Sequence, residues 1–146
     1  MKSDPKIKEF VQGQLSAQLT RVFQEARRTA NKPGADEIHD LRVSIRRLNT
    51  VLPAFGDLIP QSEAQSIRQR LKKVMALTTE VRNRDIAIDF LTTQDVAADH
   101  PLRVEVAADR DRASSKLQTH LRTFNRKGYA TAWRRALELT PSRAAR

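Results

Sequence analysis

The sequence contains no cysteine, and this absence excludes disulfide bonds, thiolate metal sites and a cysteine nucleophile. Aromatic residues make up only 5% of the chain, and β-branched residues are scattered, so strands are not expected to build the fold. No stretch approaches the roughly 20 consecutive apolar residues that cross a bilayer, and the N-terminus has no apolar leader segment. We therefore expect a helical protein of the cytoplasm that does not enter a membrane.

Acidic residues are also scarce relative to basic ones. The 146 residues include 27 Lys and Arg but only 17 Asp and Glu, which gives a formal net charge of +10 and a pI of about 10.8. A surplus of this size raises the local concentration of any polyanion. Nucleic acid, anionic lipid and polyphosphate therefore all qualify as partners on charge alone.

Apolar residues recur at spacings of three and four in four long segments and one short segment, the pattern of helices that pack in a bundle. The long segments begin near Pro5, Asp36, Ser62 and Leu102, and the short one begins at Tyr129. Proline and glycine residues separate several of them. We predict an all-α fold, an antiparallel bundle of about four to five helices joined by short loops.

The length of the chain suits one domain with a hydrophobic core. Residues 1–139 are expected to form this domain, and residues 140–146 a frayed basic tail.

Within the third segment, the string "LTTEV" leaves open whether the chain forms one bent helix or two. Pro53 should kink or tighten the last turn of the second helix. The predicted core consists of the apolar residues of the five segments: Ile7, Phe10, Val11, Leu15, Leu19, Val22, Phe23, Ala26, Ile38, Leu41, Ile45, Leu48, Leu52, Phe55, Ile67, Leu71, Val74, Leu77, Val81, Ile88, Phe90, Leu91, Leu102, Val106, Ala113, Leu117, Leu121, Phe124 and Leu137.

A stripe of polar and basic side chains follows the second helical segment. His39, Arg42, Arg46 and Asn49 are spaced i, i+3, i+7 and i+10, so they share one face beside the apolar seam. Like charges at this spacing repel each other by a few tenths of a kcal/mol. Two interpretations stay open: the arginines, with Arg47, pair with carboxylates of other helices, or they bind an external anion.

A second basic cluster lies in the third segment. Arg68, Lys72 and Lys73 precede Arg82, and Asp85 follows Arg82 by three residues. A carboxylate at that spacing can orient the guanidinium and leave its other donors free for an anion. The alternative is an ordinary intrahelical ion pair worth less than about 1 kcal/mol.

The two clusters together resemble a known family. The string "HDLRVSIRRL", followed some thirty-five residues later by "RNRDI", is similar to the motif pair of the CHAD domain, the conserved histidine α-helical domain. The likeness is strongest from Glu37 to Leu91. It implies an all-helical module that binds inorganic polyphosphate and associates with polyphosphate granules.

The resemblance also implies which residues form the site. Phosphate or sulfate should be able to occupy the same positions, and neither a metal nor another cofactor is expected. The implied polyphosphate-binding residues are His39, Arg42, Arg46, Arg47, Asn49, Arg68, Lys72, Lys73 and Arg82, with Asn83 and Asp85 in orienting roles.

The chain departs from the family pattern in ways that matter for the site. Asn49 stands where the pattern often has another arginine, so this position keeps a hydrogen-bonding group and loses a charge. CHAD domains commonly contain two similar helical halves, whereas the motif pair occurs once here. His120 has Thr123 where a second copy would need an arginine. We expect a short, single-half form, or a homodimer that rebuilds the two-half arrangement.

Two other classes of function compete with polyphosphate binding. Nonspecific nucleic-acid binding would use the same charge, but Trp133 and Tyr129 are the only aromatic residues expected outside the core, so base stacking is poorly supported. A phosphohydrolase would need several carboxylates around a divalent metal, and Asp85 and Asp89 are the only close acidic pair near the basic clusters. The sequence also has no glycine-rich P-loop. We expect a protein that is not an enzyme, such as a non-catalytic accessory to a phosphate-metabolising enzyme.

Overall fold

The computed structural model describes residues 5–54 and 56–137. The described residues contain no strand, so the prediction of an all-α fold is confirmed. Their helices, in chain order, are α1 (Pro5–Asn31), α2 (Ala35–Ala54), the short 3-10 helix η1 (Gly56–Leu58), α3 (Gln61–Thr93), α4 (Pro101–Arg126) and α5 (Tyr129–Ala136).

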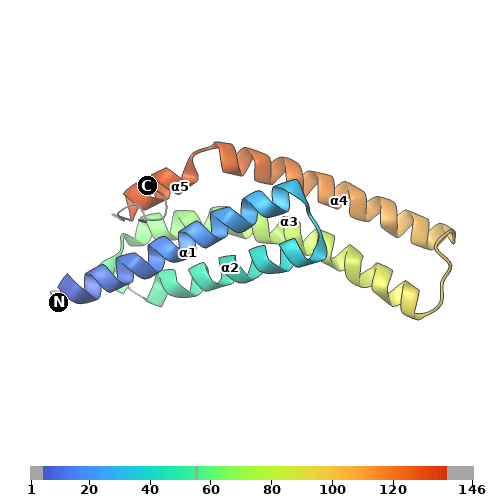
Figure 1. Cartoon of the computed structure of the whole chain (residues 1–146), viewed down its shortest axis with the longest axis horizontal. Helices are drawn as coiled ribbons and strands as arrows, with labels where there is room; N and C mark the ends of the chain where they lie inside the picture. Colours follow the sequence, from blue (N-terminus) through green and yellow to red (C-terminus); the bar gives the residue numbers. More distant parts are fainter. Residues whose placement is uncertain (1–4, 55, 138–146) are drawn as a thin grey trace.

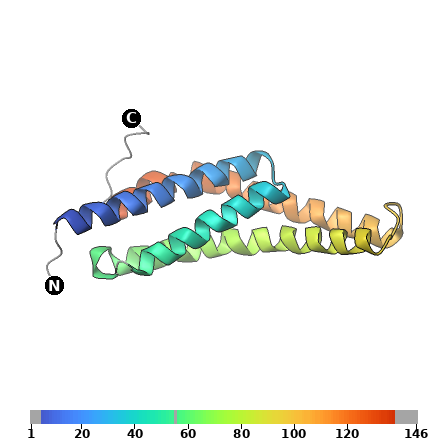
Figure 2. The ribbon, with the colours of Figure 1, turned by 60° about the horizontal axis from the view of Figure 1, so that its bottom comes forward.

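The four long helices form two antiparallel hairpins that pack against each other (Figure 1). α1 pairs with α2 and α3 with α4, while α1 also contacts α4 and α2 contacts α3. Figure 2 shows that the α3–α4 hairpin continues well beyond the turn that joins α1 to α2. One part of the molecule is therefore a bundle of all the long helices, and the remainder is the α3–α4 hairpin alone.

α3 is one continuous helix, which settles the alternative that "LTTEV" had left open. Thr78 and Thr79 donate their hydroxyl hydrogens back to the carbonyl oxygen of Met75, at 2.7 and 3.0 Å. These bonds stay within the preceding turn, so the hydroxyls do not cap a new helix and the backbone ladder continues past them.

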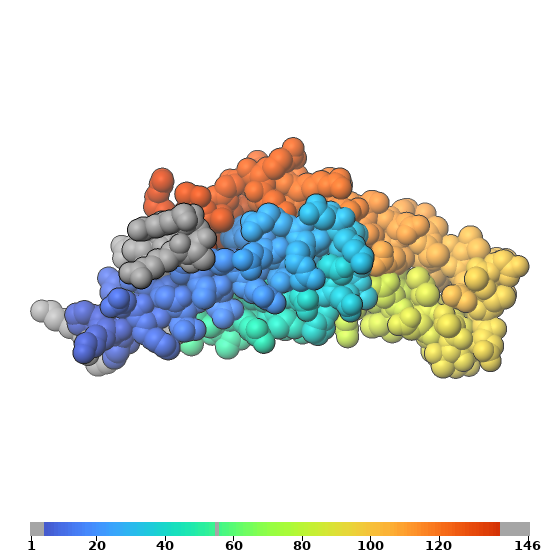
Figure 3. Space-filling model, in the orientation of Figure 1, coloured from blue at the N-terminus to red at the C-terminus, as the bar shows by residue number. Residues whose placement is uncertain are grey.

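Most of the predicted core residues are buried in one hydrophobic cluster. Four are instead exposed: Ile7 by 53%, Phe10 by 62%, Phe90 by 62% and Leu102 by 47%. The first two lie in the first turns of α1, and the other two lie in the last turn of α3 and the first turn of α4. Figure 3 shows that α1 and α2 do not extend over this end of the α3–α4 hairpin. Helical periodicity finds an apolar stripe, but it does not reveal how far neighbouring helices extend along it. Phe55 lies outside the described residues.

The two aromatic residues expected outside the core are part of it. Trp133 is only 6% exposed, and its ring lies 5.4 Å from that of Tyr129 and 5.8 Å from that of Phe124, measured between centroids. Gly128 has a φ of +72°, a left-handed conformation that lets the chain turn back so that α5 packs on the bundle. These rings therefore stabilise the fold, Trp133 from within the core and the half-buried Tyr129 from its edge.

Two predictions concern the ends of elements. Pro53 lies in the last turn of α2, which ends one residue later at Ala54, in line with a tightened helix end. The predicted domain boundary at residue 139 and the basic tail of residues 140–146 lie outside the described residues.

Candidate functional site

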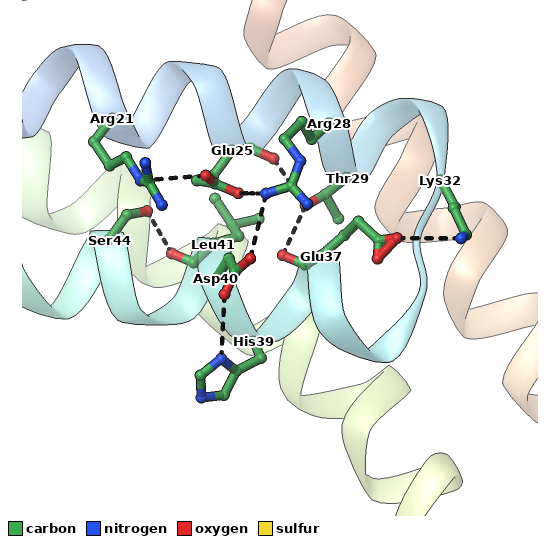
Figure 4. Close-up of polar contacts among 10 residues, drawn as sticks. All are labelled: Arg21, Glu25, Arg28, Thr29, Lys32, Glu37, His39, Asp40, Leu41 and Ser44. Carbon is green, nitrogen blue, oxygen red and sulfur yellow. Dashed lines mark hydrogen bonds and ion pairs between the residues drawn. The ribbon is translucent and has the colours of Figure 1, made fainter.

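Glu25 of α1 and Glu37 and Asp40 of α2 form ion pairs along the α1–α2 seam (Figure 4). Glu25 is buried and accepts from Arg21 at 3.2 Å and from Arg28 at 2.6 Å. Arg28 also reaches Asp40 on α2 at 3.3 Å, and Lys32 pairs with Glu37 at 3.7 Å across the same seam. Carboxylates therefore fix α1 to α2 and leave the opposite side of α2 without acidic partners.

His39 lies at the edge of this network, pointing into solvent (Figure 4). Its side chain is 74% exposed, and Nδ1 lies 3.4 Å from Oδ1 of Asp40. Hydrogen bonds from His39 and then Arg28 hold the pKa of the Asp40 carboxyl below its ordinary value. The imidazole is thus available to an external anion, but a carboxylate stands beside it.

Arg42 links α2 to α3 and is only 9% exposed. Its Nη1 donates to the hydroxyl oxygens of Thr78 and Thr79, at 2.9 and 2.8 Å. Burial lowers the pKa of this guanidinium, and the nearby charges of Arg46 and Arg82 lower it further. The charges of Arg46 on α2 and Arg82 on α3 therefore repel the charge of Arg42, and a bound anion would relieve that repulsion.

Apart from His39, which lies beside Asp40, the predicted binding residues do not pair with carboxylates in the described part of the chain. Within residues 5–54 and 56–137, no ion pair includes any of the arginines or lysines predicted for the site, so the interpretation that acids of other helices neutralise the basic stripe is not supported. Asp85 also has a different partner from the one expected. Its Oδ1 accepts from Nε of Arg110 on α4 at 2.9 Å, so it fastens α3 to α4 and does not orient Arg82. Asn83 is exposed on α3.

The tertiary structure places three sequence segments without acidic residues side by side. Residues 41–56, 64–79 and 112–137 contain neither Asp nor Glu. α3 carries the middle segment and packs against α2 on one side and α4 on the other, both antiparallel to it. The result is a broad basic face that lies on the bundled part of the molecule.

A cleft of about 510 Å³ opens between α2 and α3. Asn49 and Pro53 of α2 line one side of this α2–α3 cleft, and Arg68 and Lys72 of α3 line the other. Oδ1 of Asn49 is buried and has no hydrogen-bond partner among the described residues. An amide group left unsatisfied in a basic cleft is a group that a polar ligand or a water molecule can satisfy.

A second cleft, of about 390 Å³, opens on the other side of α3, towards α4 and α5. Arg70, Lys73, His120, Lys127 and Tyr129 line this α3–α4 cleft together with small polar residues. Nη1 of Arg70 donates to the Tyr129 hydroxyl at 2.8 Å, and its guanidinium carbon lies 4.7 Å from the ring centroid.

Sequence reasoning missed most of the α3–α4 cleft. It selected Lys73 but not Arg70, His120 or Lys127, because the family motifs do not include them. The available signal was the absence of acids from residues 112–137 together with the i, i+7 spacing of His120 and Lys127, which puts both on one helix face.

Of the predicted residues, Arg46 and Arg47 lie towards α1, beside Gln18.

Burial, and then the charge of Lys73, lower the pKa of His120. The unfolded chain should titrate near the ordinary value of about 6.5, so below that pH the unfolded state binds more protons than the folded state. We expect the thermal midpoint of the wild type to fall between pH 7.5 and pH 5, and that of His120→Gln to fall less. Equal slopes for the two proteins, measured by circular dichroism, would contradict this assignment.

The site as a whole offers cationic and amide donors. Within the described ranges, no group of three or more acidic or histidine side chains is placed to hold a metal ion. No described helix has both the length and the apolar character needed to cross a lipid bilayer. The arrangement suits an extended anion that accepts hydrogen bonds along its length.

The chain matches the model of a known protein family. That model is described as the CHAD domain, and the match covers residues 13–146. It includes both motif strings and also α4 and α5, where the motifs were not recognised. No curated protein and no solved structure matches the chain.

Proposed function

The chain belongs to the CHAD domain family, and from that premise we propose that it binds inorganic polyphosphate through the α2–α3 cleft and the basic face around it. The family is associated with polyphosphate binding. The observation that carries the proposal is that Arg68 and Lys72 line the cleft and Arg42, Arg46 and Arg82 lie on the same two helices, with no carboxylate of the described residues paired to any of the five.

Polyphosphate fits the chemistry of this face better than nucleic acid does. It presents negative charge on nearly every phosphate and has no bases, so it requires cationic donors and no stacking surface. Trp133 and Phe124 are buried, and the exposed Phe10 and Phe90 line neither of the two clefts. Tyr129 does line the α3–α4 cleft, but its ring is stacked with Trp133 and covered by the Arg70 guanidinium. A single-strand binder would need exposed aromatic rings within its basic groove.

A competition titration tests this preference. Purified protein is loaded with a fluorescent single-stranded oligonucleotide and titrated with long-chain polyphosphate or with unlabelled oligonucleotide, at matched phosphate concentration and fixed salt. We expect polyphosphate to displace the label at a phosphate concentration at least about tenfold lower, because every phosphate is accessible to the donors. If the oligonucleotide displaces as well as polyphosphate, nonspecific nucleic-acid binding is the better description.

We extend the proposal to a role without catalysis, in association with polyphosphate granules or as an accessory to a phosphate-metabolising enzyme. Asp85, one of the two close acids considered as metal ligands, is engaged with Arg110. Metal-dependent release of phosphate from polyphosphate by the purified chain would overturn the non-catalytic role. The homodimer expected from the single motif pair stays a prediction.

A further inference from the structure

The two clefts flank the same helix and share a residue. Gln69 of α3 lines both the α2–α3 cleft and the α3–α4 cleft. Lys72 opens onto the first cleft and Lys73 onto the second, so two adjacent lysines face opposite sides of one helix. The basic surface therefore does not end at the rim of the α2–α3 cleft.

The ridge between the clefts is an exposed face of α3 that an anion can cross. Gln65, Gln69, Lys72, Lys73 and Ala76 are exposed there, and no acid occurs from residue 64 to residue 79. A helix with its side chains is about 10–12 Å wide, so the path from one cleft to the other is on the order of 10 Å. Amide and ammonium donors line that path, and no carboxylate of the segment repels a phosphate on it.

The far cleft is organised to hold an anion. Tyr129 fixes Arg70 by a hydrogen bond and by the stacking of its ring, so the guanidinium is oriented before any ligand arrives. Lys127, from the end of α4, and Lys73 both line the cleft, and neither takes part in an ion pair among the described residues. The oriented guanidinium of Arg70 and the two unpaired ammonium groups can therefore bind phosphates at one end of a polyanionic chain.

We propose that a single polyphosphate chain crosses α3 and occupies both clefts at once. The inference rests on the proposed function and adds to it that affinity depends on chain length. A triphosphate is too short to engage both clefts fully. A long chain that is held in one cleft presents its next phosphates to the other at high effective concentration.

The test compares sodium triphosphate with long-chain polyphosphate at equal phosphate concentration, using isothermal titration calorimetry. The variant is Lys73→Ala/Lys127→Ala, which removes two cations of the α3–α4 cleft and leaves the Arg70–Tyr129 contact in place. Arg27→Ala/Arg103→Ala is the control, because it removes two charges that lie outside both clefts and outside the three acid-free segments, and neither residue takes part in an ion pair among the described residues.

We expect the first variant to lose about tenfold or more in affinity for the long chain and less than about threefold for triphosphate. The control variant should lose less than about threefold for either ligand. Long-chain affinity equal to that of the control overturns the crossing, and so does an equal loss for both chain lengths. If the wild type fails to bind long-chain polyphosphate at all, the proposed function itself fails, which is a separate outcome.

Discussion

Replacing Arg46 and Lys72 with alanine together is expected to lower the affinity for long-chain polyphosphate about 100-fold. Each side chain supplies a charge-assisted contact to phosphate worth at least about 1.4 kcal/mol, and each such contact is a factor of about ten in affinity. Lys72 lines the α2–α3 cleft, whereas Arg46 lies towards α1 but close enough to Arg42 to affect its pKa, so the pair tests the cleft together with the basic face beside it. Fluorescence anisotropy or calorimetry measures the loss.

The same variant should alter the salt dependence and leave the fold intact. Removing two phosphate contacts should reduce the slope of log affinity against log salt by about 1.4 to 2. Both side chains are exposed and belong to no ion pair among the described residues, so the thermal midpoint should not move appreciably. Arg27→Ala/Arg103→Ala carries the same loss of charge away from the clefts. Equal affinities for these two double variants would show that net charge alone, and not the cleft, governs binding.

Replacing Arg42 with methionine is expected to separate binding from stability. Affinity for polyphosphate should fall at least about tenfold, because a cation at the centre of the basic face is lost. The free energy of unfolding should stay the same or rise by about 1–2 kcal/mol, because a buried charge repelled by Arg46 and Arg82 is replaced by an apolar side chain of similar length.

The local structure explains why methionine is tolerated at this position. The hydroxyl hydrogens of Thr78 and Thr79 are already donated to the carbonyl oxygen of Met75, so removal of the guanidinium leaves no buried donor unpaired. Arg42→Ala is the comparison, and it should lose stability by about 1–3 kcal/mol because it leaves a void between α2 and α3. Urea denaturation measures both. A methionine variant that is several kcal/mol less stable than the wild type would show that Arg42 is retained to hold the helices together.

Much of the fold follows from local rules. The spacing of Ile38, Leu41, Ile45 and Leu48 defines a helix with one apolar face whatever surrounds it, and all four are buried. Glycine and proline mark where helices end because of their backbone conformations, as at Gly128. Where the prediction of burial was wrong, as at Phe90, the cause lies in the α3–α4 hairpin, whose length relative to α1 and α2 no local pattern encodes.

The candidate site, like the fold, was predicted only in part from the sequence. Spacing and the family motifs, which do not depend on packing, predicted Arg42, Arg46 and Arg82 as binding residues. Their binding role stays a prediction, and the structure places Arg46 and Arg82 close enough to Arg42 to lower its pKa. From the sequence, Asp85 was expected to orient Arg82, its neighbour along α3. In the structure Asp85 pairs instead with Arg110, which is 25 residues away on α4. Local spacing proposes i, i+3 partners, but a neighbouring helix can supply a better one.

Charge, absence of cysteine and helical periodicity thus settled from the sequence that the chain is an α-helical protein with an excess of cations and a CHAD motif pair. Only the tertiary structure decided that three segments without acids lie side by side, that Arg42 is buried against Thr78 and Thr79, and that a second basic cleft with Arg70 and Lys127 lies across α3. The physical reason is that periodicity is a property of a single helix. A cleft is a property of two or more helices, and the partners and register of those helices are set by side-chain packing between residues far apart in the sequence.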